Sequence, residues 1–337
     1  MRLKLLSGIK SSITGFLLVL SISAGAQSAN FILTFNTEGG GASGETTITL
    51  PFLGTSALGH YDVDFNNDGV FGDTDAASLS LDDLVGTQNI TFAAPGVYTI
   101  QIRPSAAQNS MSFGFKGGSS PEKLISVDNW GSLTWQDLDG AFYGCTNMNV
   151  LATDVLRLYS ATDMSDMFRG ASNFNGDISA WDVSSVEVMS GLVRGASNFN
   201  GDLSAWDVSS VAVMNGLFGG ASNFNGDIST WDVSSVTNMG SMFNGASNFN
   251  RDVSAWDVSS VTNMNYMFLD ASNFNGDISA WDVSSVTSIA HMFNGASNFN
   301  GDLSAWDVSS VTVMNGLFLG ASNFNGDIST WDVSSVT

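Results

Sequence analysis

A tryptophan recurs every 25 residues through the second half of this 337-residue chain, and that spacing constrains the fold more than any other feature. The column consists of Trp181, Trp206, Trp231, Trp256, Trp281, Trp306 and Trp331. Around it the motif GASNFNGD…WDVSSV returns with few changes. The apolar residues of one unit are too few to close a core, but stacked units bury their apolar edges on one another. The sequence therefore predicts a stack of repeats.

The apolar spacing changes within each unit. Trp181 and Val183 are two residues apart, which predicts a short parallel β-strand with both side chains inward. Val186, Met189 and Val193 follow at i, i+3 and i+7, which predicts about two helical turns. We therefore expect a repeat solenoid with a short strand and a short helix in each 25-residue turn.

Two glycine columns carry conformational information. The column of Gly195 holds glycine in most units and Asp270 in one, and aspartate tolerates the left-handed conformation. We expect a left-handed residue there, ending the predicted helix. The column of Gly176 admits Arg251, so we expect no positive φ in that column.

The units also match a known repeat. The matching residues are Met164-Ser165-x-Met167-Phe168-x-Gly170-Ala171 and Phe174-Asn175-x-Asp177-Ile178-Ser179-x-Trp181-Asp182-Val183-Ser184-Ser185-Val186, with their copies over about 121–337. They resemble the 26-residue bacterial surface-protein repeat family (DUF285) of BspA-like surface proteins. The resemblance implies a leucine-rich-repeat-like solenoid and a role in adhesion or interaction at a cell surface. The Phe174-Asn175 pair is the candidate to supply an asparagine ladder.

The N-terminus reads as a targeting segment. A basic stretch containing Arg2, Lys4 and Lys10 is followed by the short apolar run 13–22 and by Ala24-Gly25-Ala26. This order is typical of a secretory signal peptide, and the run is too short for the roughly 20 residues that a membrane span needs. We expect cleavage after Ala26 and a secreted or cell-surface protein that is not an integral membrane protein.

Residues 30–104 alternate in the manner of β-strands, at 31–35, 46–50 and 97–102. The segment 94–100 resembles the last strand of PKD-like domains, and 61–64 resembles their central strand. This resemblance implies a small β-sandwich over 30–104, joined by a linker at 105–120 to degenerate cap turns at 121–169. The regular repeats occupy 170–337. The chain ends before the predicted helix of its last unit, so we expect further units beyond residue 337.

One acidic loop fits a calcium-binding template. Asp64, Asn66, Asp68 and Asp75 stand at positions 1, 3, 5 and 12 of the template, with Gly69 at position 6. The carbonyl of Val70 would be the ligand at position 7. The loop resembles those of dockerin domains, which would make calcium the cofactor. The alternative is a polar turn between strands, where the same residues are common.

Two aspartate columns, those of Asp177 and Asp182, run along the repeats. Solvent, local N–H capping or bound cations would relieve their repulsion. The tryptophans are expected to form a buried ladder, with sugar stacking as the less favoured alternative. The columns that vary between units contain Arg194, Tyr266, Leu269 and His291, which form a candidate partner surface. The alternative is that these positions vary because solvent tolerates any residue there.

Composition excludes several functions. The 32 acidic residues outnumber the 10 basic ones, and the net charge of −22 argues against binding nucleic acid. No nucleophile motif or phosphate loop occurs, so we do not expect an enzyme. We predict a multivalent protein that contacts an extracellular protein or glycan. A non-binding spacer is the first alternative, and a carbohydrate-active enzyme the second.

Overall fold

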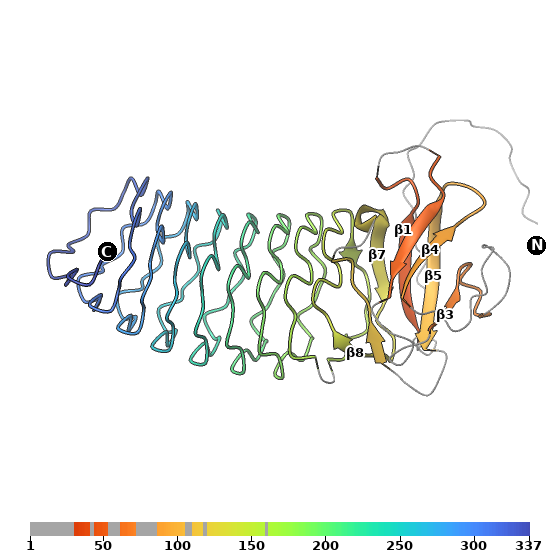
Figure 1. Cartoon of the computed structure of the whole chain (residues 1–337), viewed down its shortest axis with the longest axis horizontal. Coiled ribbons are helices and arrows are strands. Elements are labelled where there is room, and N and C mark those ends of the chain that lie inside the picture. Colours follow the sequence, from red (N-terminus) through yellow and green to blue (C-terminus); the bar gives the residue numbers. More distant parts are fainter. Residues whose placement is uncertain are drawn as a thin grey trace, which may run out of the picture.

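The computed structural model describes residues 30–40, 44–52, 61–71, 86–104, 110–116, 120–158 and 161–337. A β-rich part forms one end of the elongated molecule, and stacked coils form the rest (Figure 1). The predicted signal peptide (1–26) lies outside the described residues. None of the described residues belongs to a helix long and apolar enough to cross a membrane.

The β-rich part is built on alternating apolar residues. In the first strand Phe31, Leu33 and Phe35 are fully buried, and this strand lies between two antiparallel neighbours. The elements are β1 (Phe31–Asn36), β2 (Thr47–Pro51), β3 (Tyr61–Asp64), β4 (Thr87–Thr91), β5 (Val97–Pro104), β6 (Ser110–Ser112), the 3-10 helix η1 (Pro121–Lys123), β7 (Leu124–Asn129), β8 (Thr134–Asp137) and β9 (Asn149–Val150).

The main sheet is mixed. Its order is β3-β5-β1-β7-β9; its first three pairs are antiparallel, and β7 and β9 are parallel. Two smaller pairs accompany it, the antiparallel β2–β4 and the parallel β6–β8. The parallel pairing of β7 with β9 is the first of a series of parallel backbone contacts that continues between successive coils. It is followed by isolated bridges such as Thr134↔Arg157 and Asp163↔Val188.

Each coil of 25 residues is joined to the next by backbone hydrogen bonds from alternate residues. In the first coil (170–194) the N–H groups of Met189, Gly191 and Val193 donate to carbonyl oxygens of the second coil (195–219) at 2.9–3.1 Å. The N–H groups between them, those of Leu192 and Arg194, donate three residues back within their own coil. Half of this segment's donors therefore find acceptors only when a neighbouring coil is present.

The core is continuous from Phe31 to Leu317. Trp130 connects the two parts, because its ring lies 6.0 Å from that of Phe31 and 5.4 Å from that of Trp181. Along the coils, phenylalanine rings stack in register, as in the pair Phe224–Phe249 at 6.0 Å and 6°. Such ring pairs contribute about 0.5–1.5 kcal/mol each beyond area burial.

The predicted fold class is wrong. The repeats were expected to form a leucine-rich-repeat-like solenoid with a strand and a helix per turn, but the described residues contain no α-helix, and η1 precedes the coils. Residues 186–195 form successive tight turns, because Gly191 and Gly195 have φ values of 63° and 75°. A residue in the left-handed region every four positions prevents a continuous right-handed helix. The predicted strand at Trp181 and Val183 is also absent, and each coil contributes only a one-residue bridge.

The expected small β-sandwich at the N-terminus is wrong as well. Strands at 31–36, 47–51 and 97–104 occur where the alternation predicts them. However, β1 pairs on its second edge with β7, so the sheet draws strands from beyond residue 120. The sheet is mixed because that later segment also provides the parallel pair β7–β9.

The conformational predictions for the two glycine columns are confirmed. Gly195 and Asp270 both have positive φ, 75° and 55°. Gly176 and Arg251, in the second column, are absent from the positive-φ residues. The left-handed residue therefore ends a tight turn in each coil, where the sequence had suggested the end of a helix.

Candidate functional site

The coils differ from one another mainly in one segment. We call it the variable segment: 187–194 in the first coil and its copies 212–219, 237–244, 262–269, 287–294 and 312–319. The segment 170–186 returns with few substitutions in every later coil. Because the copies stack in register, the variable segments lie side by side. All four residues of the candidate partner surface lie in them.

Within this surface, two aromatic side chains are in contact. The rings of Tyr266 and His291, one coil apart, stack at 5.2 Å with an interplanar angle of 6°. Tyr266 is 40% exposed. The two imidazole nitrogens of His291 lie 3.1 Å from the amide nitrogen of Asn294 and 2.9 Å from that of Asn315. The ring orientation of His291 is thus fixed on the side away from Tyr266.

Both aromatic residues have a left-handed backbone. Tyr266 has φ 59° and His291 has φ 54°, where the same column holds glycine in three other coils and Ser241 in another. A bulky residue with positive φ is a backbone outlier. The sequence analysis did not identify this second left-handed column, although Gly191, four residues before Gly195, was a signal for it.

The variable segments also enclose a groove of about 290 Å³. It is lined by Arg194, Gly195, Gly219, Gly220, Ser241, Asn244 and Gly245. The groove is open above the second coil, because that coil has glycine, which lacks a side chain, at both of its outward-facing positions in the variable segment, Gly216 and Gly219. Leu269, half-buried, lies one coil beyond Asn244 in the same column. The structure thus brings Tyr266 and His291 together, and it places Arg194 in the lining of the groove, which ends at Ser241, one coil before Tyr266.

The aspartate columns are explained by local hydrogen bonds. Asp182 accepts from the N–H and hydroxyl of Ser184 at 3.2 and 2.7 Å, and Asp177 is bonded in the same way to Ser179. The hydroxyl bond and then the N–H bond lower the pKa of the Asp182 carboxyl, whereas the neighbouring Asp207 raises it. Local capping, one of the three predicted ways to relieve the repulsion, is therefore present. No group of three or more His, Cys, Asp or Glu side chains able to hold a metal is found in the described ranges.

The tryptophan ladder is buried, as predicted. From Trp181 to Trp306 the column is 3–5% exposed, so these indoles offer no sugar-stacking platform. An asparagine ladder lies nearby, since the N–H of Asn200 donates to the side-chain oxygen of Asn175 at 2.8 Å and Asn225 repeats this contact on Asn200 at 2.7 Å. The expectation that the Phe174-Asn175 pair supplies such a ladder is confirmed.

The predicted calcium loop is closed by its own hydrogen bonds. Asp64 is fully buried and accepts from the N–H groups of Asn66, Asn67 and Gly69 at 2.7–3.2 Å. Asn66 donates its amide to Asp68 at 3.0 Å, and Asp68 accepts the N–H of Val70 at 2.8 Å. Asp75, the last predicted ligand, lies outside the described residues. The calcium site and the polar turn thus both stay predictions for this loop.

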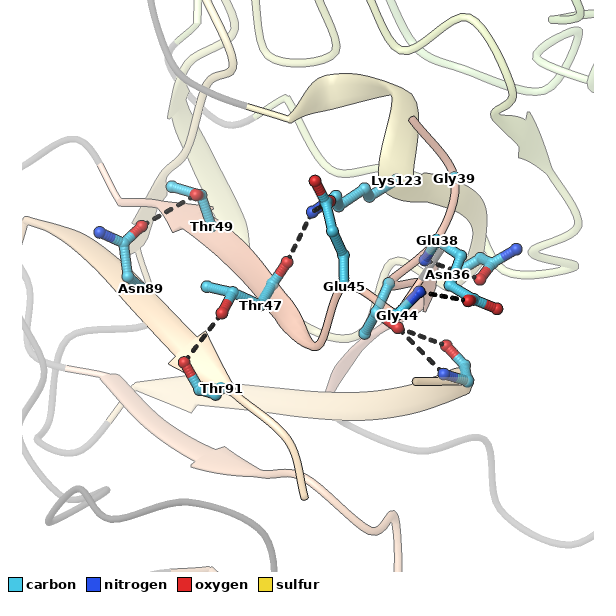
Figure 2. A network of polar contacts seen from close by, with 12 residues as sticks. Asn36, Glu38, Gly39, Gly44, Glu45, Thr47, Thr49, Asn89, Thr91 and Lys123 are labelled. Carbon is cyan, nitrogen blue, oxygen red and sulfur yellow. Dashed lines mark hydrogen bonds and ion pairs between the residues drawn. The ribbon is translucent and has the colours of Figure 1, made fainter. Parts of the chain in front are cut away.

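A second polar hollow, of about 460 Å³, lies beside the antiparallel pair β2–β4. Lys123, which is 5% exposed, donates to the carbonyl oxygen of Thr47 at 2.9 Å and forms an ion pair with Glu45 (Figure 2). Thr49 and Asn89 join the two strands of this pair at 2.9 Å (Figure 2). The buried ammonium is thus satisfied by the chain itself, and this network ties η1 to β2.

These features define a protein of stacked 25-residue coils that carries one variable face. The model of the family described as "Mycoplasma protein of unknown function, DUF285" matches residues 136–254, 203–298 and 245–337. Together these segments cover more than half of the chain, which therefore belongs to this repeat family. No curated protein and no solved structure matches the chain.

Proposed function

We propose that the protein acts outside the cell as an adhesion or interaction protein, and that the variable face of the coils contacts its partner. The proposal rests on one observation: the sequence differences between coils are confined to the variable segments. Coils that are otherwise near-copies differ at adjacent exposed positions, which form the groove and the Tyr266–His291 stack. Exposed aromatic residues and arginine are enriched at binding surfaces.

The extracellular location is part of the proposal. It is supported by the signal-peptide pattern of residues 1–26 and by the resemblance of the repeats to those of BspA-like surface proteins. N-terminal sequencing of the exported protein tests it, with Gln27 expected as the first residue. The proposal assigns the chain no catalytic step, since binding along a repeated surface requires none.

A binding comparison tests the function. The full chain is compared with a uniform-coil variant in which each variable segment is replaced by that of the sixth coil, 312–319. Both are applied to arrays of glycans and of immobilised extracellular proteins. We expect the natural chain to bind and the variant to lose that binding, while its tryptophan fluorescence stays that of a folded stack.

The same comparison addresses the spacer alternative. A spacer binds nothing on the arrays, and exchanging its segments changes nothing. The absence of any binding by the natural chain, or equal binding by both proteins, contradicts the proposed function.

A further inference from the structure

The groove lined by Arg194, Ser241 and Asn244 has the features of a small binding site, and Tyr266 lies one coil beyond Ser241 in the same column. We propose that it binds a short acidic oligosaccharide, with a carboxylate on Arg194 and a sugar ring on the free face of Tyr266. This inference rests on the proposed function and names the ligand class of the same surface. Its volume of about 290 Å³ is near the lower limit, about 300 Å³, of typical small-molecule pockets.

The first step concerns where the arginine lies. The side chain of Arg194 crosses from the first coil onto the second. Its Cγ lies 3.5 Å from the point where a side chain on Gly219 would begin, and its Nη1 lies 3.5 Å from the equivalent point on Gly216. The two glycines therefore let the guanidinium rest on the backbone at one end of the groove.

The second step concerns the charge of this arginine. Arg169, its counterpart one coil earlier, pairs with Asp166 at 3.3 Å, and Arg251 donates to the carbonyl oxygen of Asn225 at 2.7 Å. Within the described part of the chain, the Arg194 guanidinium has no hydrogen bond or ion pair. A planar guanidinium with free donors matches a carboxylate through two parallel hydrogen bonds.

The third step concerns the opposite end. The Tyr266 ring is nearly parallel to that of His291 in the next coil, so its other face points along the stack toward Ser241. Ser241 has no ring that could stack on that face, and Tyr266 is 40% exposed. With adjacent coils roughly 4.8 Å apart, the guanidinium over the second coil and the ring in the fourth are separated by about 10 Å. One sugar ring stacked on the tyrosine, and a carboxylate on it or on its neighbour, fit this length.

The fourth step concerns the groove between the two ends. The Ser241 hydroxyl and the Asn244 amide line it, and neither side chain has a hydrogen-bond partner among the residues that the structure describes. The next coil has Leu269 at the position of Asn244, and in the fifth coil the corresponding amide is used, since the side-chain amide of Asn294 lies 3.1 Å from His291. A hydroxyl-rich ligand would satisfy these free polar groups, whereas an apolar peptide side chain would leave them unpaired.

The test is calorimetric titration of the full chain with digalacturonic acid, in buffer without divalent cations. Its dimethyl ester is the matched neutral ligand. Arg194→Leu and Tyr266→Gly introduce residues that other coils carry in the same columns, so both variants are expected to fold. Arg251→Gly is the control, because it removes the same charge from a different column and restores the glycine found in other coils. Tyr266→Phe keeps the aromatic face.

We expect digalacturonic acid to bind, and its ester to bind about tenfold more weakly or worse. Arg194→Leu and Tyr266→Gly should each weaken binding by about tenfold, while Arg251→Gly leaves it unchanged. Tyr266→Phe keeps the ring and should weaken binding less than Tyr266→Gly does. Equal binding of the ester, or an equal loss in Arg251→Gly, overturns the inference. So does preferential binding of a peptide with a C-terminal aromatic carboxylate.

Failure of this inference and failure of the proposed function can be told apart. If digalacturonic acid does not bind but the natural chain still exceeds the uniform-coil variant on the arrays, only the ligand assignment is wrong. If neither protein binds anything on the arrays, the proposed function is wrong as well.

Discussion

The indole N–H of Trp206 donates to the carbonyl oxygen of Ile178, 28 residues earlier, at 3.0 Å within the buried core. The same contact recurs in each later coil, for example from Trp231 to Leu203 at 3.0 Å. Each tryptophan therefore joins two coils through a hydrogen bond as well as through packing.

Replacing Trp231 with phenylalanine should separate these two contributions. The substitution keeps an aromatic ring but removes the indole donor, and the carbonyl of Leu203 keeps only its bond from the N–H of Trp206 at 3.1 Å. The loss of one hydrogen bond of two should cost about 0.5–1.5 kcal/mol. Trp181→Phe is the matched control, because Trp181 is equally buried and its indole N–H has no hydrogen bond among the described residues. Urea unfolding followed by circular dichroism measures both. An equal loss in the two variants would assign the whole effect to packing.

The Asp182 carboxyl should titrate below its ordinary pKa of 3.8, because the Ser184 hydroxyl and N–H hold it in the charged form. A lowered folded-state pKa means that the contribution to stability is complete above the unfolded value and is lost as the pH falls through the folded one. We therefore expect stability to be flat above about pH 5 and to decline below pH 4. NMR titration of Ser184→Ala should show the Asp182 pKa moving back up; a pKa that does not move would contradict the assigned cause.

Gly220 belongs to the left-handed column of Gly195, and its backbone conformation predicts which substitutions there cost the least stability. Its φ of 71° disfavours any residue with a Cβ, and a β-branched residue most of all. Asp270 already occupies the column, so Gly220→Asp should cost less than Gly220→Val, which we expect to lose about 2 kcal/mol or more. Thermal unfolding of the two variants decides this. Equal melting temperatures would show that the column places no demand on the backbone.

The acidic loop at Asp64 distinguishes a bound cation from a self-closed turn. Because three backbone N–H groups already donate to its carboxylate, we expect the melting temperature to be the same in millimolar calcium and in EDTA. Asp64→Ala should destabilise the protein by about 2–3 kcal/mol in both buffers, since those donors lose a charged acceptor. A melting temperature that rises with calcium in the natural chain, but not in Asp64→Ala, would support the calcium alternative.

The repeat period, the buried tryptophans and the left-handed Gly195 column could be predicted because each depends on residues within one or two units. The helix prediction failed because i, i+3, i+7 spacing also arises from tight turns. Val186, Met189 and Val193 face the core in either case. What separates the two structures is the left-handed Gly191, which the helical pattern ignores.

The candidate site could be predicted only in part. Variation between coils identified Arg194, Tyr266, Leu269 and His291, and the structure places them on one face. The groove itself was not predictable, because it depends on how far the Arg194 side chain reaches over Gly216 and Gly219. That reach depends on the residues of two adjacent coils.

The alternating N–H bonds between coils have a mechanical consequence. They run along the long axis of the molecule, from each coil to the next. A force that pulls the two ends of the molecule apart would therefore act along these bonds. It would separate one coil from its neighbour at a time and would not break the bonds of all coils together. The stack should lengthen in equal steps, each freeing one coil and roughly 80 Å of chain.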